Sequence, residues 1–257
     1  MNDRTASPVL QLDNVGRRFG GLPAVDGLSI SAPPGTITGL IGPNGAGKTT
    51  VVNLIMGILK LTSGRVLFDG RDVSQVEAAD LARAGMARTF QNIRLVTEGT
   101  VLDNVLSGLH AHQRTGLWSN LLGLPSARTE QREHLREAMA LLERFGMAEL
   151  AEHRAGTLSY GHQRRIEMMR ALAMKPKLLL LDEPVAGMND AEAASLGRIF
   201  SEVAAEGVAI LLIEHNMRFV TQICSHLYVV ASGRLIAEGP PETVLADPVV
   251  IEAYLGS

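Results

Sequence analysis

Cysteine is almost missing from this sequence of 257 residues, in which Cys224 is the only one. A single thiol cannot form an internal disulfide, so the composition fits a reducing compartment. The residues around Cys224 offer no setting for a nucleophile, and we expect a buried, unreactive thiol.

Long apolar runs are also missing. The first twenty residues carry Asp3, Arg4 and Arg17 where a signal peptide would have an apolar stretch. The densest apolar runs, Leu178–Leu181 and Val208–Ile213, are far shorter than the roughly 20 residues of a membrane helix. We therefore expect a protein that does not cross a membrane by itself and works in the cytoplasm.

An excess of basic residues is lacking too. The chain has 24 Lys and Arg against 27 Asp and Glu, a net charge of −3, which gives no electrostatic case for a nucleic-acid partner. Hydrophobic residues make up 46% of the chain, enough for the core of one large α/β domain or of two small lobes.

Short apolar strands alternate with helices along most of the chain. The alternation predicts an α/β fold with a mostly parallel sheet covered by helices. Apolar helices are expected at Thr49–Leu59 and between the last two strands, and Asp69-Gly70 is expected to form a tight turn. The predicted strands are Val9–Val15, Leu28–Ala32, Thr36–Ile41, Arg65–Phe68, Leu178–Leu181 and Val208–Ile213.

The middle of the chain, from about Asn92 to Gly156, is predicted to be mostly helical. Its clearest helix is Glu130–Phe145, with an apolar stripe and Gly146 as its stop. A further helix follows Ser159 and ends before Pro176. The stripe consists of Leu135, Met139, Leu142 and Phe145.

A phosphate-binding loop is the most specific motif. The segment 42–49 fits the spacing G-x-x-x-x-G-K-[ST] and lies between a predicted strand and a predicted helix. Its glycines let backbone N–H groups surround phosphate oxygens, and the helix start directs its positive end at the same anion. Lys48 would reach the β- and γ-phosphates, and the Thr49 hydroxyl would bind Mg²⁺.

Two acidic residues complete this chemistry from far downstream. Asp182 and Glu183 follow a buried strand, at the sheet edge where α/β proteins bind ligands. Asp182 can hold the magnesium shell, and Glu183 can accept a proton from an attacking water. His215 follows another strand, and its ring can donate a hydrogen bond to a γ-phosphate.

These motifs together resemble the ATP-binding cassette (ABC) family over nearly the whole chain. Leu158-Ser-Tyr-Gly-His-Gln163 is similar to the family's LSGGQ signature, with Tyr160 in place of the first glycine and His162 in place of the glutamine. Thr89–Asn92 resembles the family's Q-loop and 186–190 its D-loop. Phe19 stands where the family has an aromatic residue that stacks on adenine.

The resemblance implies a RecA-like P-loop core with an antiparallel β subdomain and an inserted helical subdomain. We expect one ABC ATPase domain over residues 1–257, with the helical subdomain near 92–160 and a C-terminal tail near 240–257. Ser159 is a good N-cap for the helix that follows, where an anion can bind. In the family this site closes on the γ-phosphate held by the opposite subunit, so hydrolysis is expected to need a dimer.

The resemblance and the motifs together define the predicted site. Glu183 and His215 are the predicted catalytic residues, Thr49, Gln91 and Asp182 the predicted Mg²⁺ site. The signature residues acting across the dimer are Ser159, Tyr160, Gly161 and His162. The predicted ATP contacts are Phe19, Gly42, Pro43, Asn44, Gly45, Ala46, Gly47, Lys48, Thr49 and Thr50.

Within the family, the sequence is most similar to the larger ATPase subunit of branched-chain amino-acid importers. The similarity lies in the segments Arg88–Leu95, Thr115–Ser119 with Pro125-Ser126, Ile213–Met217 and Ala253–Gly256. It implies membrane permease subunits, a second ATPase subunit of the same or a homologous chain and, indirectly, an external solute-binding protein. It also implies a peripheral location on the cytoplasmic face of the membrane.

Other functions within and beyond transport stay open. The alternatives are a urea or amide importer, a lipopolysaccharide exporter and a soluble ABC protein of DNA repair or translation. The last class usually has two cassettes, coiled-coil arms or zinc-binding cysteines, which this sequence lacks. Glu183 argues against a regulatory protein that binds ATP without hydrolysing it.

Overall fold

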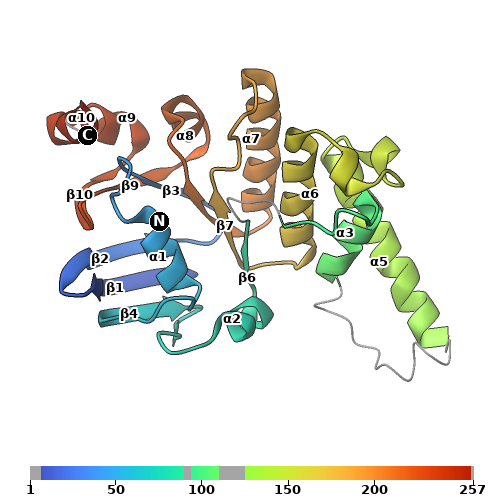
Figure 1. Cartoon of the computed structure of the whole chain (residues 1–257), viewed down its shortest axis with the longest axis horizontal. Helices are drawn as coiled ribbons and strands as arrows, with labels where there is room; N and C mark the ends of the chain where they lie inside the picture. The colour runs from blue at the N-terminus through green and yellow to red at the C-terminus, as the bar shows by residue number, and fades with distance from the viewer. Residues whose placement is uncertain (1–6, 90–93, 110–124, 256–257) are drawn as a thin grey trace, which may run out of the picture. The chain divides into compact units, whose positions relative to one another are not determined.

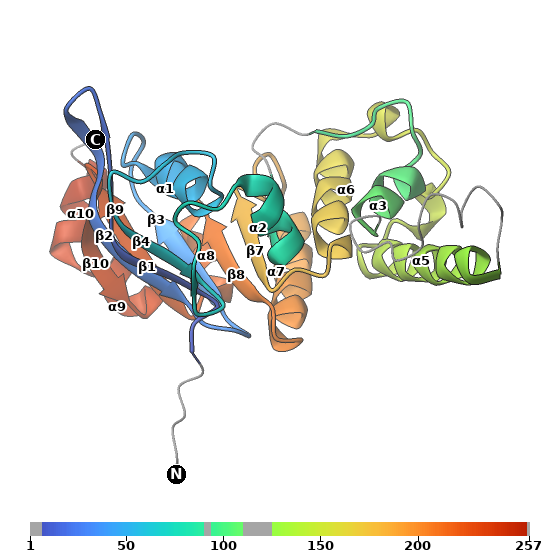
Figure 2. The ribbon, with the colours of Figure 1, turned by 90° about the horizontal axis from the view of Figure 1, so that it is seen from below.

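A computed structural model describes residues 7–89, 94–109 and 125–255. These residues fall into two compact units. Unit 1 comprises the chain up to Met86, Lys177–Pro184 and the segment from Asp190 onward; unit 2 comprises Ala87–Pro176 and Val185–Asn189. The elements of each unit are labelled in Figures 1 and 2.

Unit 1 contains an antiparallel sheet and all of a mostly parallel sheet except Ala87 and Arg88. The antiparallel sheet has the order β2-β1-β4-β5, formed by β1 (Leu10–Phe19), β2 (Leu22–Ala32), β4 (Ser63–Phe68) and β5 (Arg71–Asp72). The second sheet has the order β10-β9-β3-β8-β7-β6. Its strands are β3 (Ile37–Ile41), β6 (Met86–Arg88), β7 (Leu178–Asp182), β8 (Ala209–Ile213), β9 (His226–Ala231) and β10 (Arg234–Gly239).

The strands β3, β7 and β8 are fully buried, as their short uncharged runs predict. Every residue of these three strands is buried, and β3 pairs in parallel with β8 and β9, and β7 with β8. Leu178 and Leu180 belong to the core that also contains α1 (Lys48–Ile55) and both sheets. Leu179 and Leu181 are equally buried outside that cluster, so the parallel sheet is covered on both faces.

Most of the remaining helices of unit 1 pack against strands of the second sheet. α7 contacts β3, β8 and α8, and α9 and α10 contact β10 (Figure 1). Helices α9 and α10 lie in the segment predicted as a C-terminal tail. The bounds are α2 (Ala78–Ala84), α7 (Asp190–Ala205), α8 (Met217–Ile223), α9 (Pro241–Leu245) and α10 (Pro248–Leu255).

Unit 2 is built mostly from helices. α3 (Val101–Leu109) contacts both α5 (Pro125–Arg144) and α6 (Tyr160–Ala173). A Cβ on Gly108 would lie 2.3 Å from the Arg170 carbonyl oxygen, so α3 and α6 approach closely at this glycine. Ala148–Leu150 and Ala155–Thr157 are short 3₁₀ helices. The boundaries 92–160 of a helical subdomain stay a prediction.

The predicted apolar stripe of α5 is only partly correct. Leu142 and Phe145 are 0% and 1% exposed, but Leu135 is 44% exposed. Ala138 is fully buried one turn before Leu142, so the small residue continues the stripe where the larger Leu135 does not. Among the residues 128–144 of this helix, burial is therefore concentrated in the C-terminal half.

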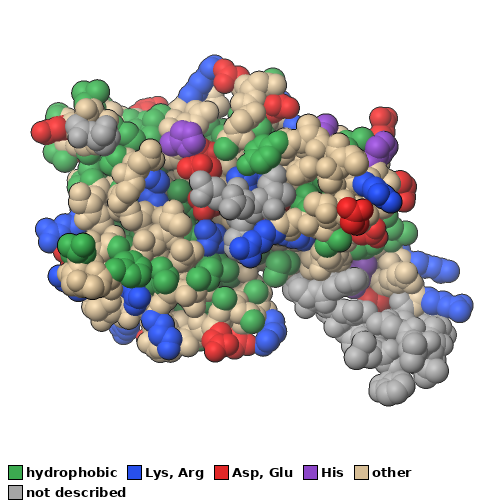
Figure 3. Space-filling model, viewed as in Figure 1, with side chains coloured by type: hydrophobic (Ala, Val, Ile, Leu, Met, Phe, Trp, Pro, Cys, Tyr) green, Lys and Arg blue, Asp and Glu red, His purple; other side chains and the backbone are tan. Residues whose placement is uncertain are grey.

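The surface carries charges of both signs. Figure 3 shows acidic and basic side chains interspersed over the visible face, as the small net charge of −3 suggests. Among the helices that the structure describes, none combines the length and the apolar character needed to span a membrane.

Candidate active site

The phosphate loop connects the end of β3 to the start of α1, and two of its glycines are sterically required. Gly42 has φ 154° and Gly47 has φ 103°. A Cβ on Gly42 would lie 2.0 Å from the Val230 carbonyl oxygen, and one on Gly47 would lie 2.5 Å from the Ala24 carbonyl oxygen. No larger residue fits at either position without moving the backbone.

The loop is also fixed by backbone hydrogen bonds to a neighbouring turn. The Gly233 N–H donates to the Ala46 carbonyl at 3.0 Å, and the Asp26 N–H donates to the Gly233 carbonyl at 2.8 Å. Gly47 is the N-cap of α1 and provides no side-chain cap. No side chain at this N-cap therefore competes with the anion that the sequence predicts to bind at the start of α1.

Lys48 supplies the positive charge of this loop. Its Nζ donates to the carbonyl oxygens of Gly42 at 2.7 Å and of Pro43 at 2.9 Å. Burial lowers the pKa of Lys48, and the charges of Glu183 and Asp182 oppose this decrease. The fold thus brings together the phosphate loop and the acidic pair, which are more than 130 residues apart in the sequence.

The acidic pair stands at the carboxyl end of β7. Asp182 is the last residue of the strand and is 6% exposed. Glu183 has φ 49°, a left-handed conformation that is uncommon for a residue with a side chain. Its N–H donates to the Ile213 carbonyl at 2.9 Å. The strained backbone at Glu183 is typical of functional positions.

His215 lies beside this pair at the end of β8. Its Nδ1 is 3.5 Å from Oε1 of Glu183, and its side chain is 65% exposed. The buried carboxylate of Glu214 accepts hydrogen bonds from the N–H groups of His215 at 3.0 Å and of Asn216 at 3.2 Å. No motif in the sequence points to Glu214, but its carboxylate fixes the turn that carries His215.

Most of the remaining predicted contacts of unit 1 are accessible, but Ala46 is only 3% exposed. Phe19 is 46% exposed at the end of β1, and the guanidinium carbon of Arg17 lies 4.7 Å from its ring centroid. One face of the ring can thus stack on Arg17 while the ring stays available to a planar base. Thr49 is exposed and Thr50 is partly buried in the first turn of α1. The loop residues Asn44 and Gly45 are exposed.

The signature segment belongs to unit 2. Ser159 is the N-cap of α6, as predicted, and its Oγ accepts from the backbone N–H of His162 at 3.4 Å. Tyr160 is 51% exposed, and the Arg164 guanidinium lies 5.7 Å from its ring centroid. Gly161 has open space where a Cβ would stand. Gln91 lies outside the described residues.

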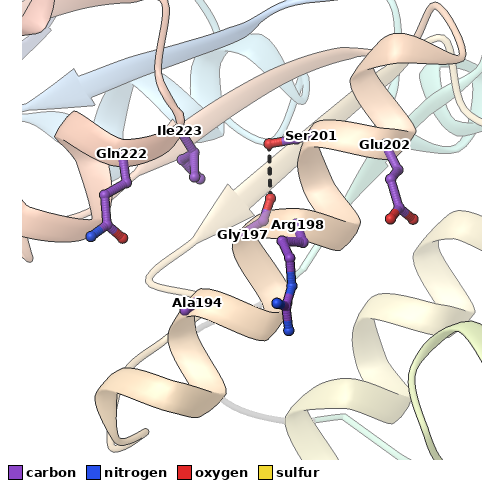
Figure 4. A pocket seen from close by; sticks show the side chains of 7 residues that line it. All are labelled: Ala194, Gly197, Arg198, Ser201, Glu202, Gln222 and Ile223. Carbon is purple, nitrogen blue, oxygen red and sulfur yellow. Dashed lines mark hydrogen bonds between the residues drawn. The ribbon is translucent and has the colours of Figure 1, made fainter.

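A separate groove of about 500 Å³ lies between α7 and α8. The Ser201 hydroxyl of α7 donates to the Gly197 carbonyl at 2.9 Å, and Ser201 and Gly197 line the groove (Figure 4). None of the predicted site residues that the structure describes lines this groove. The lining residues are Ala194, Gly197, Arg198, Ser201, Glu202, Gln222 and Ile223.

The fold and the phosphate loop define a P-loop nucleotide-binding cassette. Residues 25–186 match the family model described as ABC transporter. The chain therefore belongs to the ATP-binding cassette transporter family of ATPases. Residues 234–257 match a second model, described as Branched-chain amino acid ATP-binding cassette transporter.

Proteins of known name are similar over nearly the full chain. The high-affinity branched-chain amino acid transport ATP-binding protein LivG of Escherichia coli K12 is 43% identical over 98% of this chain and 99% of its own. The corresponding protein BraF of Pseudomonas aeruginosa is 40% identical over 97% and 98%. The structure of the ADP conformation of MJ1267, an ATP-binding cassette of an ABC transporter, is similar with a TM-score of 0.85 and 37% identity, covering 98% of this chain and 100% of that one.

Proposed function

We propose that this chain is the ATP-hydrolysing subunit of an importer of branched-chain amino acids. The observation that supports hydrolysis most directly is the convergence of the Lys48 ammonium, the Asp182 and Glu183 carboxylates and His215 at one edge of the parallel sheet. The relatives named for branched-chain amino acid transport support the choice of solute.

In this proposal the phosphates of ATP replace the loop carbonyls as partners of Lys48. The glycine-rich backbone and the N-terminus of α1 surround the phosphate oxygens, while Phe19 stacks on the adenine. The hydroxyl of Thr49, an exposed residue, and the carboxylate of Asp182 are hard oxygen donors of the kind that Mg²⁺ prefers. A bound Mg²⁺ would neutralise part of the phosphate charge.

Hydrolysis then needs a water in line with the leaving oxygen. A water oxygen forms a bond to the γ-phosphorus as the bond to the β–γ bridging oxygen breaks. Glu183 accepts the proton of that water, and His215 donates a hydrogen bond to the γ-phosphate. The products are ADP and inorganic phosphate, and the proton passes from Glu183 to solvent.

The signature is proposed to act on the ATP of a second ATPase subunit, the same or a homologous chain. Ser159 and the first N–H groups of α6 form an anion site that would close on the γ-phosphate held by that subunit. Glu183→Gln protein should then form a dimer with ATP and be largely monomeric without it, as measured by light scattering. Adding Ser159→Arg places bulk and positive charge at the closing surface and should abolish the dimer. A double variant that still dimerises with ATP would contradict this arrangement.

Transport is proposed to involve permease subunits at the cytoplasmic face of the membrane and, outside it, a solute-binding protein. The test is co-purification of this chain with its membrane partners, followed by ATPase measurements in proteoliposomes. Leucine, isoleucine or valine with the binding protein should stimulate turnover, and urea should not. Stimulation by urea alone would show that the transported solute is urea and not a branched-chain amino acid. Co-purification without any ATPase activity would reject the whole proposal.

A further inference from the structure

The signature serine has a side-chain partner within its own helix. Ser159 Oγ lies 3.0 Å from Nδ1 of His162, whereas its distance to the His162 backbone nitrogen is 3.4 Å. The ring nitrogen is therefore the closer of these two partners. His162 stands at the third residue of α6, where its ring can reach back to the N-cap.

The neighbouring side chains of the segment are directed to other partners. Gln163 Nε2 donates to the Leu158 carbonyl at 2.9 Å. Arg164 is buried and forms an ion pair with Glu167 at 3.0 Å. His162 is thus the signature side chain that is placed to orient the hydroxyl of Ser159.

The direction of this hydrogen bond decides what Ser159 can offer to a ligand. A serine hydroxyl has one hydrogen and two lone pairs. If Nδ1 of His162 carries no proton, it accepts the hydroxyl hydrogen, and Ser159 then has none left to donate. If Nδ1 carries a proton, it donates to Oγ, and the hydroxyl hydrogen is free to point elsewhere. A phosphate oxygen is an acceptor only, so it needs the second arrangement.

We propose that His162 is a positioning residue for the signature serine, donating from Nδ1 to Ser159 Oγ so that the hydroxyl hydrogen is presented to the γ-phosphate. The inference rests on the proposed function, in which Ser159 meets the ATP of a second subunit. No catalytic contact is assigned to His162 itself.

A double-mutant cycle tests whether His162 acts through Ser159 or independently of it. The parent is the Glu183→Gln protein, and the readout is the ATP concentration that gives half-maximal dimer. Ser159→Ala should raise this concentration about tenfold, the effect of one lost hydrogen bond to a charged group. His162→Ala should raise it about fivefold, the effect of losing the neutral hydrogen bond that orients the hydroxyl. The variant with both changes should resemble Ser159→Ala alone, because His162 acts only through the serine.

The matched variant is His162→Asn. The asparagine amide nitrogen is attached to Cγ as Nδ1 is in histidine, so it can donate to the same hydroxyl. We expect His162→Asn to dimerise within about threefold of the parent. A merely structural role would instead appear as equal losses in His162→Asn and His162→Ala.

The ¹⁵N chemical shift of Nδ1 in His162 reports whether this nitrogen carries the proton of the hydrogen bond. In the Glu183→Gln dimer with ATP, Nδ1 should show the shift of a protonated ring nitrogen. An unprotonated Nδ1 in that dimer would overturn the inference and leave the proposed function intact. Additive effects of Ser159→Ala and His162→Ala in the cycle would do the same. Failure of the parent to dimerise with ATP would reject the proposed dimer and the inference with it.

Discussion

Replacing Lys48 by alanine removes the positive charge from the phosphate loop. In the structure its ammonium donates to two loop carbonyls and faces the carboxylates of Asp182 and Glu183. Hydrogen bonds to charged groups contribute about 1.5–3 kcal/mol each, and Lys48 is predicted to reach two phosphates. We therefore expect Lys48→Ala to weaken ATP binding at least about a hundredfold, or roughly 3 kcal/mol.

The assay is isothermal titration calorimetry with ATP and Mg²⁺, supported by a thermal melt of each variant. Lys177→Ala is a suitable control, because the Lys177 side chain is 57% exposed and pairs with Asp69 on the surface. The control should bind ATP like the wild type. Unchanged ATP affinity together with unchanged turnover in Lys48→Ala would refute the assignment of this loop to phosphate binding.

Three further outcomes follow from packing and burial. Gly42→Ala should weaken ATP binding and lower the unfolding free energy by more than about 2 kcal/mol, because its Cβ would lie 2.0 Å from a backbone oxygen; normal calorimetry and melting would contradict this. Burial raises the pKa of Cys224 to about 12, so a thiol reagent at neutral pH should label it only as the protein unfolds, and rapid labelling of the folded chain would show otherwise. Burial also raises the pKa of Tyr254 to about 12, above its ordinary 10.0, so the folded state keeps a proton that the unfolded state loses. The hydroxyl's contribution to stability should therefore fall as pH rises from 10.0 to about 12, and denaturant titrations should show no such trend in Tyr254→Phe.

The buried strands were predictable because their sequences leave few alternatives. The predicted runs Thr36–Ile41, Leu178–Leu181 and Val208–Ile213 correspond to β3, β7 and β8 within one residue at each end. Each is short, apolar and uncharged, so it can only be buried on both faces. The glycine spacing of the phosphate loop was equally informative, since the close approach of other backbone at Gly42 and Gly47 excludes a side chain.

The hairpin of β1 and β2 was predicted too short. The predicted strands Val9–Val15 and Leu28–Ala32 miss the end of β1, which continues to Phe19, and the start of β2, which begins at Leu22. The missed part of β2 includes the buried Val25. Register shifts interrupt the pairing near Val15 and Arg17, so the regular alternation of apolar and polar residues is lost there. Both residues at the tip, Phe19 and Leu22, are exposed and carry no burial pattern.

The ends of helices and the contacts between side chains could not be predicted from the sequence alone. α1 ends at Ile55, before the predicted Leu59, because Met56 caps it and Gly57 follows with φ 65°. The sequence indicated that Ser159 caps α6, but the contact of its hydroxyl with the His162 ring depends on a rotamer that no spacing reveals.

The turnover of Glu183→Gln decides whether Glu183 is the general base of ATP hydrolysis. Glutamine has nearly the same size as glutamate but cannot take a proton from the attacking water. The variant should bind ATP normally while its steady-state ATPase rate falls by about 10²–10⁴, the contribution of a general base. Glu238→Gln, the same change at an exposed position of β10, should leave the rate unaltered. ATP hydrolysis near the wild-type rate in Glu183→Gln would contradict the assignment of Glu183 as the base.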